Sequence, residues 1–315
     1  MAAFDIEGIV QSLHAVRHGW RQRQQRLIEP GVRHLPSREA LRQIVEKLKG
    51  VLFPMWLGPP DLRQESEDLY VAHALDAVLN ELFAQARLKL RYAARYRDGG
   101  EATEIAARLP EICGLLDEDV LAAYHGDPAV GSVDEVLLCY PGILAIIHYR
   151  IAHELYRLGL PLLARMLAEH AHADTGVDIH PGTRIGAGFF IDHGTGVVIG
   201  ETAIIGERVR IYQAVTLGAK RFPRDAAGHL EKGLARHLIV EDDVVIYAGA
   251  TLLGGITIGC DAVIGGNVWL HDVPPGSHVT QAVPSSEVSQ PAAQAAARSA
   301  AGSAALAADA KGVIA

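Results

Sequence analysis

The chain has 315 residues, of which 49% are hydrophobic, so it is long enough for two domains with a sizeable core. Its formal net charge of −8 at pH 7 argues against a nucleic-acid-binding protein, which needs a basic surface. Three cysteines without metal-ligand or disulfide spacing favour a reducing cytoplasm. The N-terminus lacks the apolar segment of a signal peptide, and charged residues interrupt the most apolar stretch, 142–160, so no membrane span is expected.

Residues 1–174 are predicted to form an all-helical domain. Apolar residues within 61–96 recur at steps of three and four, which is the spacing of one face of an amphipathic helix. A second helix is expected to begin at Pro36. Asp127-Pro128 predicts the start of a third helix, because proline is tolerated at the first helical position.

From residue 178 onwards the chain follows a six-residue period. Aliphatic residues occupy every sixth position in three phased runs, the second displaced from the first by two residues. The runs are Ile179, Ile185, Ile191 and Val197; Ile199, Ile205, Ile211 and Leu217; and Val240, Ile246, Leu252, Ile258, Ile264 and Leu270. A helix would have a period near 3.6 and a simple strand a period of 2, whereas six is typical of a hexapeptide parallel β-helix.

Three hexads, roughly 18 residues, close one triangular coil with the aliphatic side chains inside. The sequence therefore predicts the α+β class, in which the helical domain is followed by a β-helix domain over 175–284. Residues 218–239 break the period and are predicted to form a loop expelled from the coil, and such long loops are often functional. The Ala- and Ser-rich segment 285–315 lacks apolar residues for a core and is predicted to be a mobile tail.

An Asp-His pair in the first run is a candidate for chemistry. Asp192 and His193 follow the inward-pointing Ile191, so their side chains are expected to point outwards near a corner. Asp178 lies about one coil earlier than His193, so the chain has returned to a similar corner when it reaches His193. Its carboxylate could accept the Nδ1 proton of His193 and leave Nε2 free as a base. A turn aspartate beside a solvated histidine is the alternative interpretation.

Arg236 and His237 stand where the expelled loop rejoins the coil. A guanidinium in this place could hold a carboxylate through two hydrogen bonds, although an ion pair at the loop end would use the same residues. The loop contains more basic than acidic side chains, which suggests an anionic ligand such as a phosphorylated cofactor, unless the loop is merely solvated. His180, next to Pro181, is interpreted as a corner histidine that packs on its neighbour.

These motifs together resemble the serine O-acetyltransferases, a family of hexapeptide acyltransferases. The matching blocks are VDIHPGTRIGAGFFIDHGTGVVIGETAIIG, QAVTLGA, the Arg-His pair at 236–237, and GATLLGGITIGCDAVIGGNVWL. The resemblance covers about 178–284 and extends more weakly upstream through GDPAV. The sequence LGAKRFP at the start of the expelled loop is similar to a branch of the family that has a longer loop. The resemblance implies a left-handed coil, trimers that often pair into hexamers through the helical domains, and active sites between neighbouring chains.

The resemblance also implies a reaction, the transfer of an acetyl group from acetyl-CoA to L-serine, which gives O-acetylserine for cysteine biosynthesis. His193 would be the general base that takes the proton of the serine hydroxyl, and Asp178 would orient its imidazole. Asp127 and Asp192 would hold the serine ammonium group. No metal would be needed, because the thioester is already activated.

The remaining implied contacts belong to the serine carboxylate and to acetyl-CoA. Arg236 and His237 would hold the carboxylate. Four residues would line the acetyl-CoA groove with their backbone, namely Gly218, Ala219, Ala248 and Gly249.

Three other functions stay open at this point. A hexapeptide acyltransferase could act on another hydroxyl or amine acceptor. A γ-type carbonic anhydrase would need three zinc-binding histidines, and the spacing of His180, His193, His229 and His237 supplies no convincing triplet. A non-catalytic scaffold would have no use for the pair formed by Asp178 and His193.

One partner is expected to be missing. Family members that dock into O-acetylserine sulfhydrylase end in an isoleucine that carries the terminal carboxylate. This chain ends Ile314-Ala315, which places the isoleucine one residue too early. We therefore expect no such complex.

Overall fold

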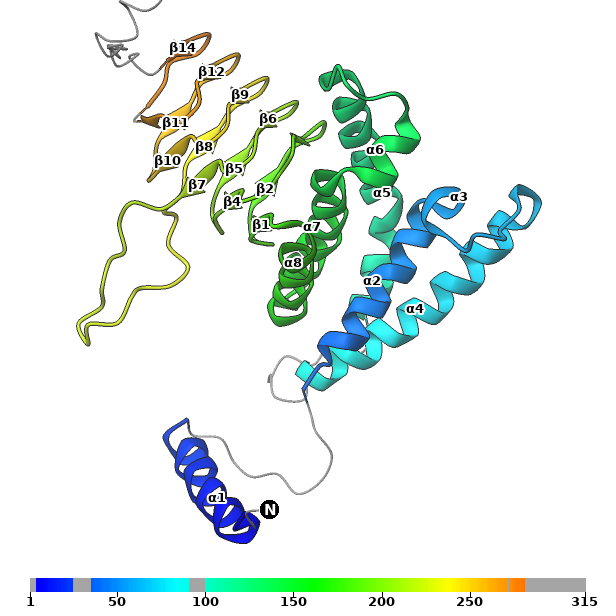
Figure 1. Ribbon diagram of the computed structural model, residues 1–315, viewed down its shortest axis with the longest axis vertical. Helices are drawn as coiled ribbons and strands as arrows, with labels where there is room; N and C mark the ends of the chain where they lie inside the picture. Colours follow the sequence, from blue (N-terminus) through cyan, green and yellow to red (C-terminus); the bar gives the residue numbers. More distant parts are fainter. Residues whose placement is uncertain (1–3, 25–34, 91–99, 271, 281–315) are drawn as a thin grey trace, which may run out of the picture. The chain divides into compact units, whose positions relative to one another are not determined.

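The computed structural model describes residues 4–24, 35–90, 100–270 and 272–280. Helices occupy the chain up to Thr175 and short parallel strands follow from Asp178 (Figure 1), which confirms the predicted fold class. One compact unit spans Met1–Val279. The predicted tail and the last residues, Ile314-Ala315, lie outside the described residues.

The helical part is divided into eight α-helices and one 3₁₀ turn within the described residues. They are α1 (Ile6–Arg23), α2 (Arg38–Leu52), α3 (Pro54–Leu57), η1 (Gln64–Ser66), α4 (Glu67–Leu90), α5 (Gly100–Gly126), α6 (Val133–Cys139), α7 (Pro141–Arg157) and α8 (Pro161–Thr175). No single helix in the described part of the chain is long and apolar enough to cross a membrane. The helices α6 and α7 have the length and composition of a membrane span only when they are taken together, and a bend of 73° separates them.

The helix predicted to start at Asp127-Pro128 does not form there, so this prediction is wrong. Asp127 follows the end of α5 in a turn, where its Oδ1 accepts a hydrogen bond from the backbone N–H of Ala129 at 2.8 Å. The next helix, α6, begins after Ser132, whose hydroxyl accepts from the N–H of Glu135 at 3.2 Å. A serine with glutamate three residues later is a strong helix start, and it outcompetes the Asp-Pro signal a few residues upstream.

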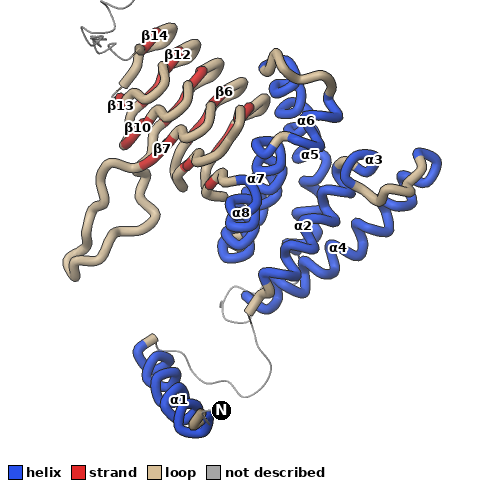
Figure 2. Tube along the Cα trace, viewed as in Figure 1, coloured by secondary structure: helices blue, strands red, loops and turns tan. Residues whose placement is uncertain are grey.

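The strands form three parallel sheets, which the chain visits in turn as far as β13 (Figure 2). The first sheet contains β1 (Asp178–Ile179), β4 (Val198–Ile199), β7 (Thr216–Gly218), β10 (Thr251–Leu253) and β13 (Trp269–Leu270). The second contains β2 (Arg184–Ile185), β5 (Ile204–Ile205), β8 (Ile239–Val240) and β11 (Thr257–Ile258). The third contains β3 (Phe190–Ile191), β6 (Arg210–Ile211), β9 (Val245–Ile246), β12 (Val263–Ile264) and β14 (His278–Val279). This topology is a parallel β-helix.

The aliphatic residues of the six-residue period form the interior of the coil. Apart from Ile185 in the first coil and Leu270 in the last, all of them are at most 4% exposed. They belong to one hydrophobic core that continues into the helices. The period therefore predicted the inward-facing positions because each hexad contributes one side chain to the same buried column.

The displacement between the first two runs marks a wider corner in the first coil. Ile199 pairs with Leu217, eighteen residues later, but Ile179 pairs with Ile199, twenty residues later. The two extra residues are accommodated where the chain turns from the third sheet back to the first, at 192–196. This turn has positive φ angles at three positions, which are His193, Gly194 and Gly196.

A buried ion pair fixes the helices to the first coil. Arg150 of α7 donates from Nε and Nη2 to both oxygens of Asp119 of α5, at 3.0 and 2.9 Å. Its Nη1 and Nη2 also donate to the carbonyls of Ile185 and Gly186, each at 2.6 Å, while Asp119 accepts from the N–H of Phe189. Because both charged groups are 5% exposed or less, this network fixes α5 and α7 against the turn between β2 and β3.

Candidate active site

The predicted site residues lie on two edges of the β-helix. We call the corner between the third and first sheets (residues 192–196 and 247–249) the His193 edge. The corner between the first and second sheets (residues 200–203 and 219–238) is the Arg236 edge. The first sheet lies between these edges, and Figure 2 shows the long loop leaving the stack after β7.

The His193 side chain projects from the wider corner. Its φ of 59° lies in the left-handed region, which is uncommon outside glycine and is often found at functional sites. The side chain is 70% exposed, and its Nε2 lies 3.9 Å from Oδ1 of Asp192. An imidazole in this position is accessible to a ligand.

Asp192 is a nearly buried carboxylate that is fixed from one side. Its Oδ2 accepts a hydrogen bond from Arg210 Nη2 at 3.2 Å. The Arg210 guanidinium lies over the rings of Phe190 and Tyr212, at 5.0 and 4.8 Å from their centroids. These aromatic contacts stabilise the cation and leave the Oδ1 side of Asp192 facing His193.

Asp127 contributes a second carboxylate from the end of α5. Tyr140 donates its hydroxyl proton to Oδ2 at 2.5 Å, and the Ala129 N–H donates to Oδ1. The hydrogen bond from Tyr140, then that from Ala129, and the charges of Arg210 and His193 together lower the pKa of Asp127, against a small effect of burial. The structure therefore brings Asp127, Asp192 and His193 together on one edge.

On the other edge, Arg236 is held by an ion pair within the chain. Its Nη2 donates to Oε2 of Glu201 at 2.7 Å, and the Tyr156 hydroxyl of α7 donates to Oε1 at 3.2 Å. Burial opposes ionisation of Glu201, but the hydrogen bond from Arg236 and the neighbouring charges outweigh it and lower the pKa of the carboxyl. Arginine has five N–H donors, so the ion pair orients the guanidinium and leaves donors for a ligand.

His237 is held by Thr202, which the sequence analysis did not single out. The Thr202 hydroxyl lies 2.8 Å from Nδ1 of His237, and the Thr202 N–H donates to the same nitrogen at 3.1 Å. Burial, followed by the charge of Arg236, lowers the pKa of His237. The imidazole is therefore held in its neutral form.

Asp178 is the first residue of β1 and pairs with Val198 in the first sheet. Its Oδ1 lies 3.6 Å from Nη1 of Arg165, and its charge acts on His180. The His180 ring packs edge-on against Tyr156, with centroids 5.8 Å apart. No hydrogen bond or ion pair between Asp178 and His193 occurs within the described chain, so the orienting role of Asp178 stays a prediction.

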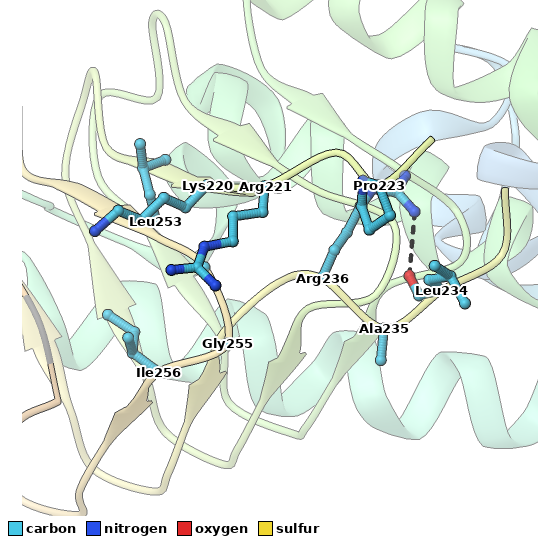
Figure 3. A pocket seen from close by; sticks show the side chains of 10 residues that line it. Lys220, Arg221, Pro223, Leu234, Ala235, Arg236, Leu253, Gly255 and Ile256 are labelled. Atoms are coloured by element: carbon cyan, nitrogen blue, oxygen red, sulfur yellow. Dashed lines mark hydrogen bonds between the residues drawn. The ribbon is translucent and has the colours of Figure 1, made fainter. Parts of the chain in front are cut away.

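The residues predicted to contact acetyl-CoA also divide between the edges. Gly218 ends β7 and Ala219 starts the long loop, whereas Ala248 and Gly249 form the turn between β9 and β10 on the His193 edge. A pocket of about 330 Å³ adjoins the first pair. Figure 3 shows its lining, which includes three basic side chains, Lys220, Arg221 and Arg236.

Four contributors to these edges were missed, and their contacts explain why. Tyr140 and Arg210 lie on different elements from the residues they contact, and Glu201 and Thr202 precede Arg236 by more than thirty residues. The six-residue period indicates which side chains point outwards, but it contains no information on which outward side chains meet. Within the described residues, no group of three or more His, Cys, Asp or Glu side chains is arranged to hold a metal ion.

The fold and these side chains define a class of protein. An exposed histidine beside two carboxylates on a hexapeptide β-helix, with a basic pocket on a second edge, is suited to base-assisted transfer from an anionic donor to a small acceptor. The class is therefore that of the hexapeptide acyltransferases.

Comparison with known proteins specifies the family. No protein-family model matches the chain. The chain is 57% identical over 262 residues to the plasmid serine acetyltransferase of Synechococcus elongatus, over 79% of this chain and 82% of that protein. It is 48% identical over 177 residues to serine acetyltransferase of Bacillus licheniformis, over 56% of this chain and 77% of that protein.

Solved structures agree with the sequence relatives. A crystal structure of serine acetyltransferase isoform 3 from Entamoeba histolytica in complex with cysteine matches with a TM-score of 0.67 and 35% identity, over 81% of this chain and 86% of that chain. Serine acetyltransferase from Neisseria gonorrhoeae in complex with serine matches with a TM-score of 0.52 and 28% identity, over 78% and 95%. The chain belongs to the serine acetyltransferase family and is an acyltransferase.

Proposed function

We propose that the chain transfers the acetyl group of acetyl-CoA to the hydroxyl of L-serine, with His193 as the general base. Nε2 of His193 takes the hydroxyl proton as the serine oxygen attacks the thioester carbonyl. The new C–O bond forms, the C–S bond breaks, and the imidazolium returns the proton to the leaving thiolate. The observation that supports this role is the 70% exposed imidazole beside the Asp192 carboxylate. A positioned base contributes about 10²–10⁴ in rate.

The charges on the two edges suit the two ends of a zwitterionic amino acid. Asp127 and Asp192 are proposed to hold the serine ammonium group. Arg236 and His237 are proposed to hold its carboxylate, which matches the preference of guanidinium for paired oxygen atoms.

The distance between the edges supports a site made by two copies of the chain. Extended backbone crosses the first sheet from Val197 to Glu201, four steps that span roughly 13 Å, and the side chains project from opposite ends of this span. One serine molecule cannot reach both. We propose that the His193 edge of one copy faces the Arg236 edge of the next, and that three copies close a ring. Asp178 would then approach the His193 of the neighbouring copy.

The same arrangement would join the two halves of the acetyl-CoA groove. Gly218 and Ala219 would come from one copy, and Ala248 and Gly249 from its neighbour. In a homotrimer closed by this head-to-tail contact, every His193 edge has an Arg236 edge as its partner, and pairing of trimers into hexamers would use surfaces outside the β-helix edges. Light scattering coupled to size exclusion would give the number of copies.

A thiol-release assay tests the proposed reaction. The purified full chain is mixed with acetyl-CoA and L-serine, and free CoA thiol is followed with a thiol-reactive dye while O-acetylserine is identified by mass spectrometry. L-threonine, L-homoserine and an amino sugar serve as competing acceptors. Thiol release that depends on L-serine is expected. Faster turnover with another hydroxyl or amine acceptor would overturn the choice of substrate.

We also propose a cytoplasmic location. Cys113, Cys139 and Cys260 are all free thiols in the structure, which agrees with a reducing compartment. Cell fractionation with activity measured in each fraction would check this location.

A further inference from the structure

Thr202 is placed to control the protonation state of His237. The residue lies in the turn after β4, on the Arg236 edge. Its Oγ1 accepts hydrogen bonds from the backbone N–H groups of Arg236 at 3.0 Å and of His237 at 3.2 Å. The same oxygen lies 2.8 Å from Nδ1 of His237. One threonine therefore binds both the backbone and the ring of the residue pair at the end of the long loop.

The number of donor protons and lone pairs on Thr202 and His237 allows one arrangement of the hydrogen bonds between them. A threonine hydroxyl has one proton and two lone pairs, and the two backbone N–H groups occupy the lone pairs. The hydroxyl proton is then directed at Nδ1 of His237. The Thr202 N–H donates to Nδ1 as well, at 3.1 Å. A nitrogen that accepts from two donors carries no proton of its own, so the proton of the neutral ring is on Nε2.

The surroundings of the ring act in the same direction. Burial lowers the pKa of His237, and the positive charge of Arg236 and the neighbouring His180 lower it further, while Glu201 opposes them. Glu201 is itself neutralised by Arg236 and hydrogen-bonded to Tyr156 of α7. These groups come from the loop end, the turns after β1 and β4, and α7, and their combined effect disfavours the imidazolium.

The ring lies flat against the chain at Gly200. A Cβ at this position would overlap with Nε2 and Cδ2 of His237, so the absence of a side chain at Gly200 makes room for the imidazole. No hydrogen-bond partner for Nε2 occurs among the described residues. Within the part of the chain that the structure describes, the Nε2–H group is thus a donor that remains available to a ligand.

We propose that Thr202 is a positioning residue that holds His237 as the neutral Nε2–H tautomer, so that its free N–H donates to the serine carboxylate. This inference rests on the proposed role of His237 in binding serine. It assigns a function to the Glu201-Thr202 turn as a whole, because Glu201 orients the guanidinium of Arg236 while Thr202 orients the ring of His237. Both donors are then set before serine arrives.

The tautomer is measured directly by NMR of the full chain labelled with ¹⁵N in the histidine rings. The His237 signals are assigned by their loss in His237→Gln. The parent and Thr202→Ser should show Nε2 protonated and Nδ1 unprotonated throughout pH 6–8. In Thr202→Val, which keeps the shape but removes the hydroxyl, His237 should titrate at higher pH than in the parent. A parent ring protonated on Nδ1, or one that titrates near the ordinary histidine pKa of about 6.5, would overturn the proposal whatever the activity.

Kinetics then separate the tautomer from the proposed binding role. Thr202→Val is expected to raise the serine KM roughly tenfold, the effect of losing one oriented hydrogen bond, and to leave the acetyl-CoA KM within twofold. Thr202→Ser should restore the parental serine KM. If the NMR result holds but Thr202→Val and His237→Gln both leave the serine KM unchanged, the donor does not bind serine, and the link to the carboxylate is wrong. If Thr202→Val does not fold, the parent spectrum and Thr202→Ser still decide the tautomer.

Discussion

The two edges of the β-helix differ in how far their polar groups are already satisfied inside one chain. On the Arg236 edge, Glu201 and Thr202 hold Arg236 and His237 with hydrogen bonds of 2.7–3.2 Å. On the His193 edge, the imidazole is 70% exposed and its Nε2 lies 3.9 Å from the Asp192 carboxylate, beyond hydrogen-bonding distance. The difference indicates that the groups proposed to bind the serine carboxylate are oriented in advance, whereas the proposed base becomes oriented only when a neighbouring copy and a substrate are present.

Removal of His193 is expected to have the largest effect. His193→Ala should lower kcat for serine acetylation by about 10²–10⁴, the usual contribution of a positioned base, because it removes the proposed proton acceptor. Its exposed side chain makes few contacts, so the thermal midpoint should stay close to that of the parent. The matched control is His229→Ala, which removes another exposed histidine 3.8 Å from an aspartate, in the long loop. Equal activity of the two variants would show that His193 is not the base.

The next largest effect should come from the buried ion pair of Asp119 and Arg150, which anchors the helices to the first coil. Asp119→Asn leaves the Arg150 charge buried without a counter-ion, which should cost about 3–5 kcal/mol of unfolding free energy. The exposed pair of Arg208 and Asp243 serves as the control, since Asp243→Asn should cost at most about 1 kcal/mol. Denaturant unfolding at neutral pH measures both. Similar losses would mean that the helices do not depend on this anchor.

Arg236→Ala should act on one substrate. The serine KM is expected to rise roughly tenfold to a hundredfold, the effect of losing a charge-assisted hydrogen bond, with little change in the acetyl-CoA KM. Arg236→Lys should lie between parent and alanine because it keeps the charge and loses the planar fork. Arg224→Ala, a loop arginine that donates to the Gly228 carbonyl, is the control. A rise in the acetyl-CoA KM alone would assign Arg236 to the cofactor pocket.

The smallest predicted effect is on pH-dependent stability, and it should come partly from the Arg236 edge. Burial is the main cause of the lowered pKa values of His148, His153, His180 and His237. The unfolded chain therefore binds protons at higher pH than the folded chain, so stability is complete above about pH 6.5 and falls as the pH drops towards the folded pKa values. Denaturant midpoints between pH 8 and pH 5 should show this decline, and His237→Gln should make it shallower. An unchanged slope would mean that His237 is not buried in its neutral form.

The sequence predicted the coil better than the contacts on its surface. The six-residue period located the inward column, and the shift between Val197 and Ile199 marked the wider corner that carries His193. The period could do so because each hexad repeats the same local geometry. The helix start at Asp127-Pro128 was wrong because a stronger capping sequence follows at Ser132.

Contacts between distant elements had no comparable signal. Tyr140 reaches Asp127 from the start of another helix, and Thr202 reaches His237 across the whole length of the expelled loop. Neither residue type stands out in the sequence, because serine, threonine and tyrosine hydroxyls are common on surfaces. The pairing becomes visible only when the register of the coils places these residues side by side.

The central claim, that one site takes its two edges from two copies, is tested most directly by mixing two variants that are each impaired at low serine concentration. His193→Ala and Arg236→Ala chains are co-expressed with different affinity tags, and assemblies that contain both are purified through both tags. In such assemblies some sites combine the intact His193 edge of one variant with the intact Arg236 edge of the other. In a three-membered ring that contains both variants, one of the three sites combines the two intact edges, so about a third of the parental serine acetylation should return at low serine concentration. Activity no higher than the average of the two variants alone would show that both residues act from the same chain, and would contradict the account.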